Sequence, residues 1–74
     1  MKNQITHVGI EIQATTADHA MTVAQKFNTE HLDGRMKAIV VDEIAHQTYW
    51  VTLAESEALA QTAHETYLSD NGWR

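Results

Sequence analysis

Histidine is the residue type with the widest range of chemistry in this chain, and five of its 74 residues are histidines. Imidazole binds metal ions and changes its charge between about pH 5 and 8. The five are His7, His19, His31, His46 and His64. No two of them stand four residues apart, as two ligands on one helix face would, and the chain contains neither an HExxH motif nor a cysteine. The spacing therefore predicts no metal site, although histidines gathered on a dimer surface would make association sensitive to pH.

One short segment of the chain resembles a known metal-binding strand. The letters ITHVGI, residues 5–10, are similar to the opening strand of vicinal-oxygen-chelate (glyoxalase-type) modules, in which a metal-binding histidine precedes a helix. The resemblance implies that His7 would be that ligand. It covers six residues of 74, and it departs from the family in two respects. The distance from His7 to the next expected helix is long, and a helix stands where the family has a closing strand with an acidic ligand. We therefore assign no metal ligand and no cofactor.

The residues that support nucleophilic or acid–base catalysis are also few. Cysteine is absent, and the serines, Ser56 and Ser69, stand at expected helix ends without a GxSxG motif around either. Asp42 and Glu43 adjoin an expected turn, where solvated carboxylates are common. The three glycines are isolated from one another, so no phosphate-binding loop is present. The sequence predicts no catalytic residue.

Composition bounds the class of protein and its partners. The chain has 5 basic and 10 acidic residues and a formal net charge of −5. Because only Arg35 and Lys37 among the basic residues stand close together, we expect no nucleic-acid partner. No apolar run approaches the roughly 20 residues of a membrane span, and the first residues are polar, so we expect neither a membrane segment nor a signal peptide. The lack of cysteine fits a cytoplasmic protein. A chain of this length predicts a single domain, 1–74.

Three segments have the pattern of β-strands. Apolar residues alternate over residues 5–14, which predicts a strand with one solvated face. Residues 36–44 and 48–53 are rich in β-branched and aromatic side chains and predict two strands joined by a turn near 45–47. Residues 38–41 are apolar on both faces, which is typical of a strand covered on both sides.

Two further segments have the pattern of helices. Thr15, or alternatively Thr16, can cap a helix that extends to about residue 31. Its apolar stripe is rich in alanine, so we expect this helix to lie close to the sheet. Ser56 can cap a second helix. The predicted inner face of that helix holds Leu59, Ala63, Thr66 and Tyr67, with Ala60 alongside.

These elements predict an α+β fold with the order β-α-β-β-α. We expect a two-layer sandwich in which a three-stranded mixed sheet carries both helices on one face. Two strand orders remain open. In the favoured order, residues 48–53 lie between the other two strands, an arrangement that resembles a ferredoxin-like fold without its last strand. In the alternative order, residues 36–44 are central.

A sheet covered on one face predicts self-association. The uncovered face would carry Trp50 with Ile39, Val41 and Ile5, and monomers rarely expose a contiguous apolar patch of that kind. The edge of the first strand would also be open. We therefore predict a small non-enzymatic interaction module that forms a homodimer or binds a protein partner through these residues.

Two other functions remain open from the sequence. The first is a sensor or enzyme that binds a small ligand or a metal at the dimer interface, with His7 or His46 at the lip of the site. The second is an acidic inhibitor or antitoxin-like protein, which would require the acidic side chains to gather on one surface.

Overall fold

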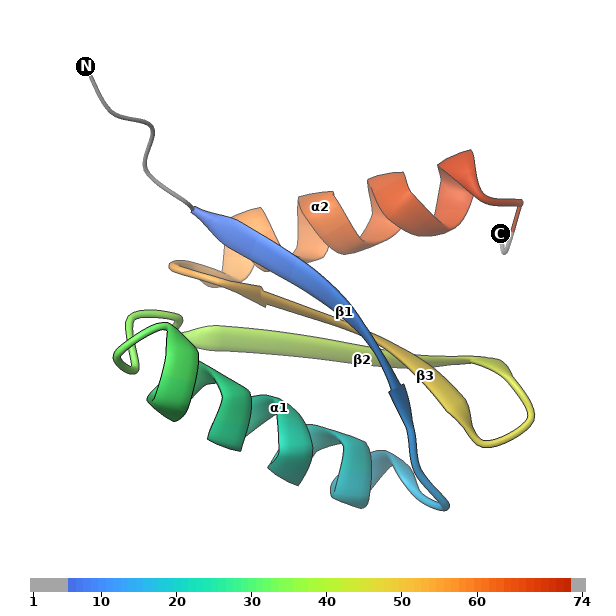
Figure 1. Ribbon diagram of the computed structural model, residues 1–74. Helices are drawn as coiled ribbons and strands as arrows, with labels where there is room; N and C mark the ends of the chain where they lie inside the picture. The colour runs from blue at the N-terminus through green and yellow to red at the C-terminus, as the bar shows by residue number, and fades with distance from the viewer. Residues whose placement is uncertain (1–5, 73–74) are drawn as a thin grey trace.

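A three-stranded antiparallel sheet and two helices form the fold, in the predicted order β-α-β-β-α (Figure 1). The structure is a computed structural model that describes residues 6–72. The elements are β1 (His7–Gln13), α1 (Ala17–His31), β2 (Ala38–Ala45), β3 (Thr48–Ala54) and α2 (Glu57–Asp70). The predicted α+β sandwich class is confirmed, and so are the type and order of every element.

β3 is the central strand of the sheet, which has the order β1-β3-β2. This order is the favoured one of the two predicted orders. Both neighbours run antiparallel to β3, and Val51 of β3 lies between Ile10 of β1 and Val41 of β2. The prediction of a mixed sheet is therefore wrong, because β1 and β2, which run parallel to each other, are separated by β3 and do not pair.

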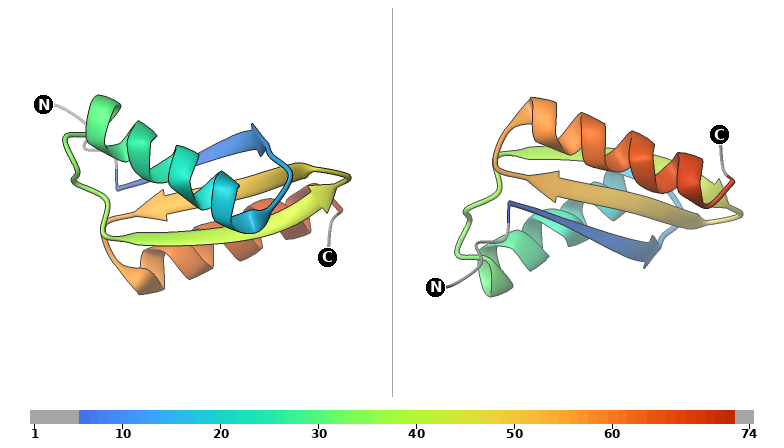
Figure 2. Two further views of the ribbon diagram at one scale, coloured as in Figure 1. Left: turned by 90° about the horizontal axis from the view of Figure 1, so that it is seen from below. Right: turned by 90° about the horizontal axis from the view of Figure 1, so that it is seen from above.

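The two helices lie on opposite faces of the sheet, as the two views of Figure 2 show. The prediction of two layers, with both helices on one face, is wrong, because the helices and the sheet between them form three layers. It rested on the handedness of crossover connections, which constrains a helix only when a following strand returns to the same sheet. α1 connects β1 to β2 and is bound by this rule, whereas no strand follows α2 among the described residues. α2 instead covers the sheet face that α1 leaves open.

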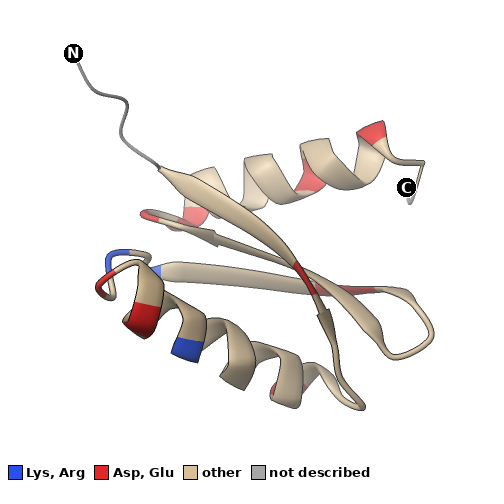
Figure 3. Ribbon diagram, in the orientation of Figure 1, with Lys and Arg blue, Asp and Glu red and all other residues tan. Residues whose placement is uncertain are grey.

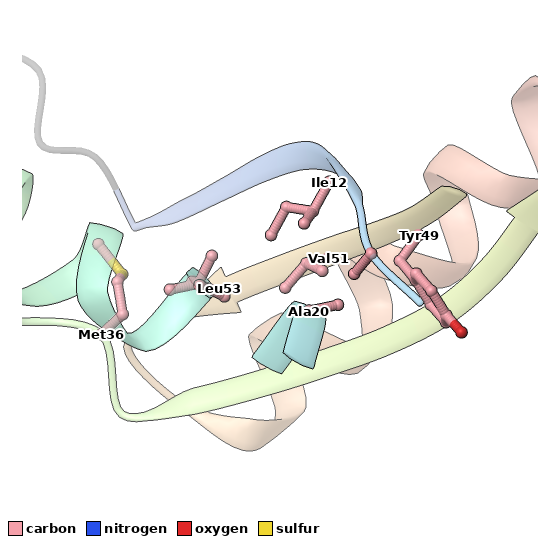
Figure 4. Packing of buried hydrophobic residues seen from close by; sticks show 8 residues of the cluster. Ile12, Ala20, Met36, Tyr49, Val51 and Leu53 are labelled. Carbon is pink, nitrogen blue, oxygen red and sulfur yellow. The ribbon is translucent and has the colours of Figure 1, made fainter. Parts of the chain in front are cut away.

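The face beneath α1 holds the main apolar cluster (Figure 4). Its buried members are Ile12, Ala14, Ala20, Ala24, Met36, Tyr49, Val51 and Leu53. Ala20 and Ala24 have no exposed surface. Because their side chains are small, the α1 backbone can approach the sheet closely, as the alanine-rich stripe predicts.

The face beneath α2 is more polar, since it holds the two buried polar residues, Thr52 and His64. The buried residues of α2 are Ala60, His64 and Leu68, at successive intervals of four residues. The predicted inner face differs, since Leu59 is 40% exposed and Thr66 is exposed. The prediction left His64 outside the stripe, and it therefore did not recognise that a histidine holds the central inward position.

Side-chain caps fix where both helices begin. The Oγ1 atom of Thr16 accepts a hydrogen bond from the His19 N–H (3.1 Å), and Oγ of Ser56 accepts one from the Leu59 N–H (3.3 Å). Ser56 is the predicted cap of the second helix. For the first helix the cap is Thr16, the second of the two candidates, so α1 begins one residue later than Thr15 would allow.

Gly9 is the point where β1 approaches the Trp50 ring most closely. A β-carbon at residue 9 would overlap Cζ2 of Trp50. The ring has little room to withdraw, because its other face is stacked on Tyr67 of α2. Glycine at this position is therefore a packing requirement and not a source of flexibility.

We expect Gly9→Ala to lower the free energy of unfolding by about 1–3 kcal/mol, the usual cost of overpacking a filled site. For a domain of this size each kcal/mol lowers the melting temperature by about 4–8 °C. Thermal and urea unfolding followed by circular dichroism measure the change. Gln13→Ala, at an exposed position of the same strand, is the control and should be close to neutral. Equal stability of the two variants would contradict the packing assigned to Gly9.

Candidate functional site

The structure divides the four predicted interface residues between two covered faces. Ile39 and Val41 pair with Leu53 and Val51 across the β2–β3 ladder, so they lie on the α1 face, partly buried against the main cluster. Trp50 lies on the opposite face, where its ring is stacked on Tyr67 of α2. Ile5 lies outside the described residues. The open face that suggested this set is covered by α2, and the described members do not form one surface.

Trp50 is part of the internal packing between the sheet and α2. Its ring is stacked on the Tyr67 ring with 3.7 Å between centroids and 6° between planes. Gly9 lies against the indole ring on the sheet side. The Nε1 atom of Trp50 is buried, and no described residue accepts its hydrogen bond. Aromatic contact rather than hydrogen bonding therefore holds this ring in place.

A buried chain of hydrogen bonds crosses from the sheet to α2. Nδ1 of His64 lies 2.8 Å from Oγ1 of Thr52 on β3, and Nε2 lies 2.8 Å from Oδ2 of Asp42 on β2. His64 has no exposed surface, Thr52 is 2% exposed, and the Asp42 side chain is 39% exposed. An ionised carboxylate can only accept hydrogen bonds, so Nε2 of His64 carries a proton. In the neutral ring, Nδ1 then accepts a hydrogen bond from the Thr52 hydroxyl.

The order carboxylate, imidazole, hydroxyl is that of a nucleophilic triad, but the surroundings do not allow this use. The Thr52 hydroxyl is buried between the sheet and α2. The hydroxyl of a nucleophile has to reach a substrate carbonyl, which this position does not permit. The arrangement instead satisfies three polar groups at the centre of the α2–sheet contact, and it locks the rotation of the helix on the sheet.

Sequence reasoning missed the hydrogen bonds that join Asp42, His64 and Thr52, and the reason can be identified. Thr52 lies on the Trp50 side of β3, and His64 was placed outside the predicted stripe of α2. The signal that could have found them is the four-residue spacing of Ala60, His64 and Leu68, which leads to a small, a polar and a large residue on one inward face. A buried histidine requires partners, and the neighbouring strands supply a hydroxyl and a carboxylate.

Two hydrogen bonds at the ends of the β1–β3 ladder show which backbone groups of β1 face outward. The Ala14 N–H donates to the Gln47 carbonyl (3.0 Å), and the Glu55 N–H donates to the Thr6 carbonyl (3.1 Å). Because residues of an antiparallel strand bond alternately to its two sides, the even-numbered residues of β1 bond to β3. The N–H and carbonyl groups of the odd-numbered residues point away from the sheet, and no described residue pairs with them. These residues are His7, Gly9, Glu11 and Gln13.

The two edges of the sheet differ in how they are protected. Both helices lie mainly over β3 and β2, and β1 extends beside them (Figure 2). β2 is irregular between Glu43 and Ala45, and a bulge of this kind discourages further pairing. β2 also carries adjacent acids, Asp42 and Glu43, whereas β1 carries a single acid, Glu11, and neither proline nor lysine. The outer edge of β1 is therefore the less protected one.

The histidines are separated in the fold. His19 and His46 line one cavity of about 400 Å³ at the β2–β3 turn, together with polar residues of the β1 end. His7 is exposed on β1 beside Leu59 of α2. Within residues 6–72, no group of three or more histidine, aspartate or glutamate side chains is placed to hold a metal ion. The two histidines proposed for the lip of a ligand site, His7 and His46, do not line the same pocket.

The acidic residues are dispersed over the molecule (Figure 3). They occur on both helices, on β1 and β2, and in the connections before β2 and before α2. Glu55 forms an ion pair with Arg35 at 3.0 Å. This distribution does not provide the single acidic surface that the inhibitor or antitoxin-like hypothesis requires.

Comparison with known proteins gives no match. No family model, no curated protein and no solved structure matches the chain significantly. Neither helix within the described residues is long and apolar enough to cross a membrane. The function therefore has to be argued from the geometry of this chain.

We expect Thr52→Val to destabilise the fold by about 1–3 kcal/mol, because it leaves Nδ1 of His64 buried without a partner. The double variant Thr52→Val with His64→Leu should cost less than the sum of the two single changes, since both buried polar groups are removed together. A double-mutant cycle in urea measures this coupling. Thr48→Val is the matched control on the same strand, because its hydroxyl bonds only an exposed turn carbonyl. A coupling of zero would contradict a functional hydrogen bond between Thr52 and His64.

Proposed function

We propose that this protein is a small non-enzymatic interaction module that acts as a homodimer through the outer edge of β1. The observation that carries the proposal is the row of unpaired backbone groups on His7, Gly9, Glu11 and Gln13. A strand edge of this kind pairs readily with another extended strand. The proposal keeps the first strand from the predicted interface and replaces the sheet face by the sheet edge.

The side chains beside this edge favour association as well. Val8 and Ile10 project to the α1 face and are only partly buried, so a strand added outside β1 would cover them further. Removing apolar surface from water contributes about 25 cal/mol per Å². The gain matters for a chain of 74 residues, which on folding alone buries a smaller fraction of its surface than a larger domain does.

The non-enzymatic part of the proposal rests on the polar groups of the described residues. The triad-like chain of Asp42, His64 and Thr52 is buried and serves the packing of α2. The module would therefore act by binding, either as a dimer alone or as a dimer that presents its helices to a protein partner. The lack of cysteine supports a cytoplasmic location.

We expect light scattering after size exclusion to give twice the 8.3 kDa mass of one chain. Glu11→Pro removes one outward N–H without touching the bonds from β1 to β3, and it should shift the protein to a monomer with unchanged circular dichroism. Glu11→Gln keeps that N–H and is the matched control, which should remain a dimer.

Two results would overturn the proposal. One is a monomeric parent protein at the highest soluble concentration. The other is a folded Glu11→Pro variant that is still a dimer. If Glu11→Pro does not fold, His7→Pro gives the same test at the first residue of the strand, where proline is tolerated.

A further inference from the structure

We infer that two copies pair β1 against β1 in antiparallel orientation, with Ile10 on the two-fold axis. The inference rests on the proposed function, since it specifies the register of the same contact. Two identical strands related by a two-fold axis perpendicular to the sheet run antiparallel. Outward-facing residues of one copy hydrogen-bond to outward-facing residues of the other, so odd-numbered residues lie opposite odd-numbered ones. The axis therefore passes midway between the two copies of one residue, and the candidates for that residue are the central positions of β1.

The number of hydrogen-bonded pairs that β1 can form favours Ile10 over its neighbours. Ile10 is the midpoint of His7–Gln13, so a contact centred there pairs all seven residues of the strand. The outward-facing residues then form four hydrogen-bonded pairs: His7 with Gln13, Gly9 with Glu11, and the two symmetric equivalents. Each such pair makes two bonds. A contact centred on Gly9 or on Glu11 leaves two residues of the described strand unpaired and loses one of these pairs.

The side chains agree with this register. On the α1 face, Ile10 lies opposite Ile10 of the partner subunit, and Val8 lies opposite Ile12 of the partner subunit. These residues form one continuous apolar row across the axis. Cross-strand pairs of β-branched residues stabilise a sheet.

The charges on the other face of β1 point to the same register. Glu11 lies opposite Gly9 of the partner subunit, which has no side chain to repel it. Moving the axis by one residue to Glu11 would place two carboxylates directly opposite each other, an unfavourable pair in a chain of net charge −5.

The edge of β2 is a poorer site for a second copy. Its self-pairing would bring Asp42 and Glu43 of both copies into one short stretch, with Glu57 of α2 beside the same edge. The irregularity between Glu43 and Ala45 also shortens the regular ladder that a partner strand could follow. Pairing through β1 instead joins two three-stranded sheets into one sheet of six strands, with a helix of each copy on either face.

Because the chain has no cysteine, a single introduced cysteine is the only thiol of each copy, and any disulfide has to join two copies. In the inferred register, Ile10 and its mate form a non-hydrogen-bonded pair with Cα atoms about 4.5 Å apart, within the range that a disulfide spans. Ile10→Cys should therefore form a covalent dimer in a glutathione redox buffer, seen as a doubled mass on non-reducing gels. Val8→Cys is the control. Its two copies would lie about 14 Å apart, four residues along the strand, and should stay monomeric on the gel.

A second measurement avoids any change to the packed face. His7 and Gln13 are both exposed and lie opposite each other in the inferred register. A mixture of His7→Cys and Gln13→Cys chains should give the mixed disulfide, whereas each variant alone should give little, because its own copies lie about 20 Å apart.

The outcomes separate this inference from the proposed function. A monomeric parent protein sinks both. A dimer by light scattering that fails to cross-link at Ile10 and in the His7/Gln13 mixture sinks the register alone. Cross-linking of Val8→Cys to the same extent as Ile10→Cys also overturns it, because it shows random collision or another register. A dimer that instead cross-links through Val40→Cys would move the contact to β2.

Discussion

The burial of β3 on both faces is the constraint on which the rest of the structure depends. Val51 and Leu53 have no exposed surface beneath α1, and Thr52 and Ala54 are almost as completely buried beneath α2. A sheet of three strands has one strand that can be covered in this way, and the chain uses one helix for each of its faces. The sheet edges are therefore the parts of the sheet that the helices do not cover, and the edge of β1 is the less protected of the two.

The periodicity of the sequence predicted the local elements and their order, because these depend on short-range patterns. Alternation over residues 5–14 and the β-branched run before Leu53 correspond to β1, β2 and β3, and the residues before each helix include its cap. The strand order was predicted by resemblance to a ferredoxin-like arrangement and not by local pattern, since the two-sided apolar run of residues 38–41 favoured a central β2, whereas β3 is central. Local pattern was sufficient for the elements and their order along the chain.

The side of the sheet that α2 covers could not be predicted in the same way. No strand follows α2 among residues 6–72, so no connection rule determines its face there, and the choice depends on side-chain contacts distant in sequence. The decisive contacts are those of His64 with Thr52 and Asp42, and of Tyr67 with Trp50. Because α2 was expected on the other face, Trp50 was expected on a sheet face that only a partner would cover, and the interface prediction contained that error.

The polar chain through His64 gives α2 a specific position that its apolar residues alone do not provide. The helix buries Ala60 and Leu68 on either side of His64, which is a modest apolar area for one face of a sheet. Two hydrogen bonds of 2.8 Å to different strands fix both the rotation and the height of the helix. Buried polar groups that are fully satisfied can select one packing arrangement in this way.

The position of α2 is in turn connected to the edge of β1. Tyr67 of α2 holds the Trp50 ring, and that ring lies against Gly9, at the middle of the outward-facing row. A shift of α2 would displace the ring and remove the support beneath the strand that carries the unpaired backbone groups. The interior hydrogen bonds and the edge of β1 are therefore connected. The hydrogen bonds of His64 with Asp42 and Thr52 fix the position of α2, α2 holds the Trp50 ring through Tyr67, and the ring packs beneath Gly9 of β1.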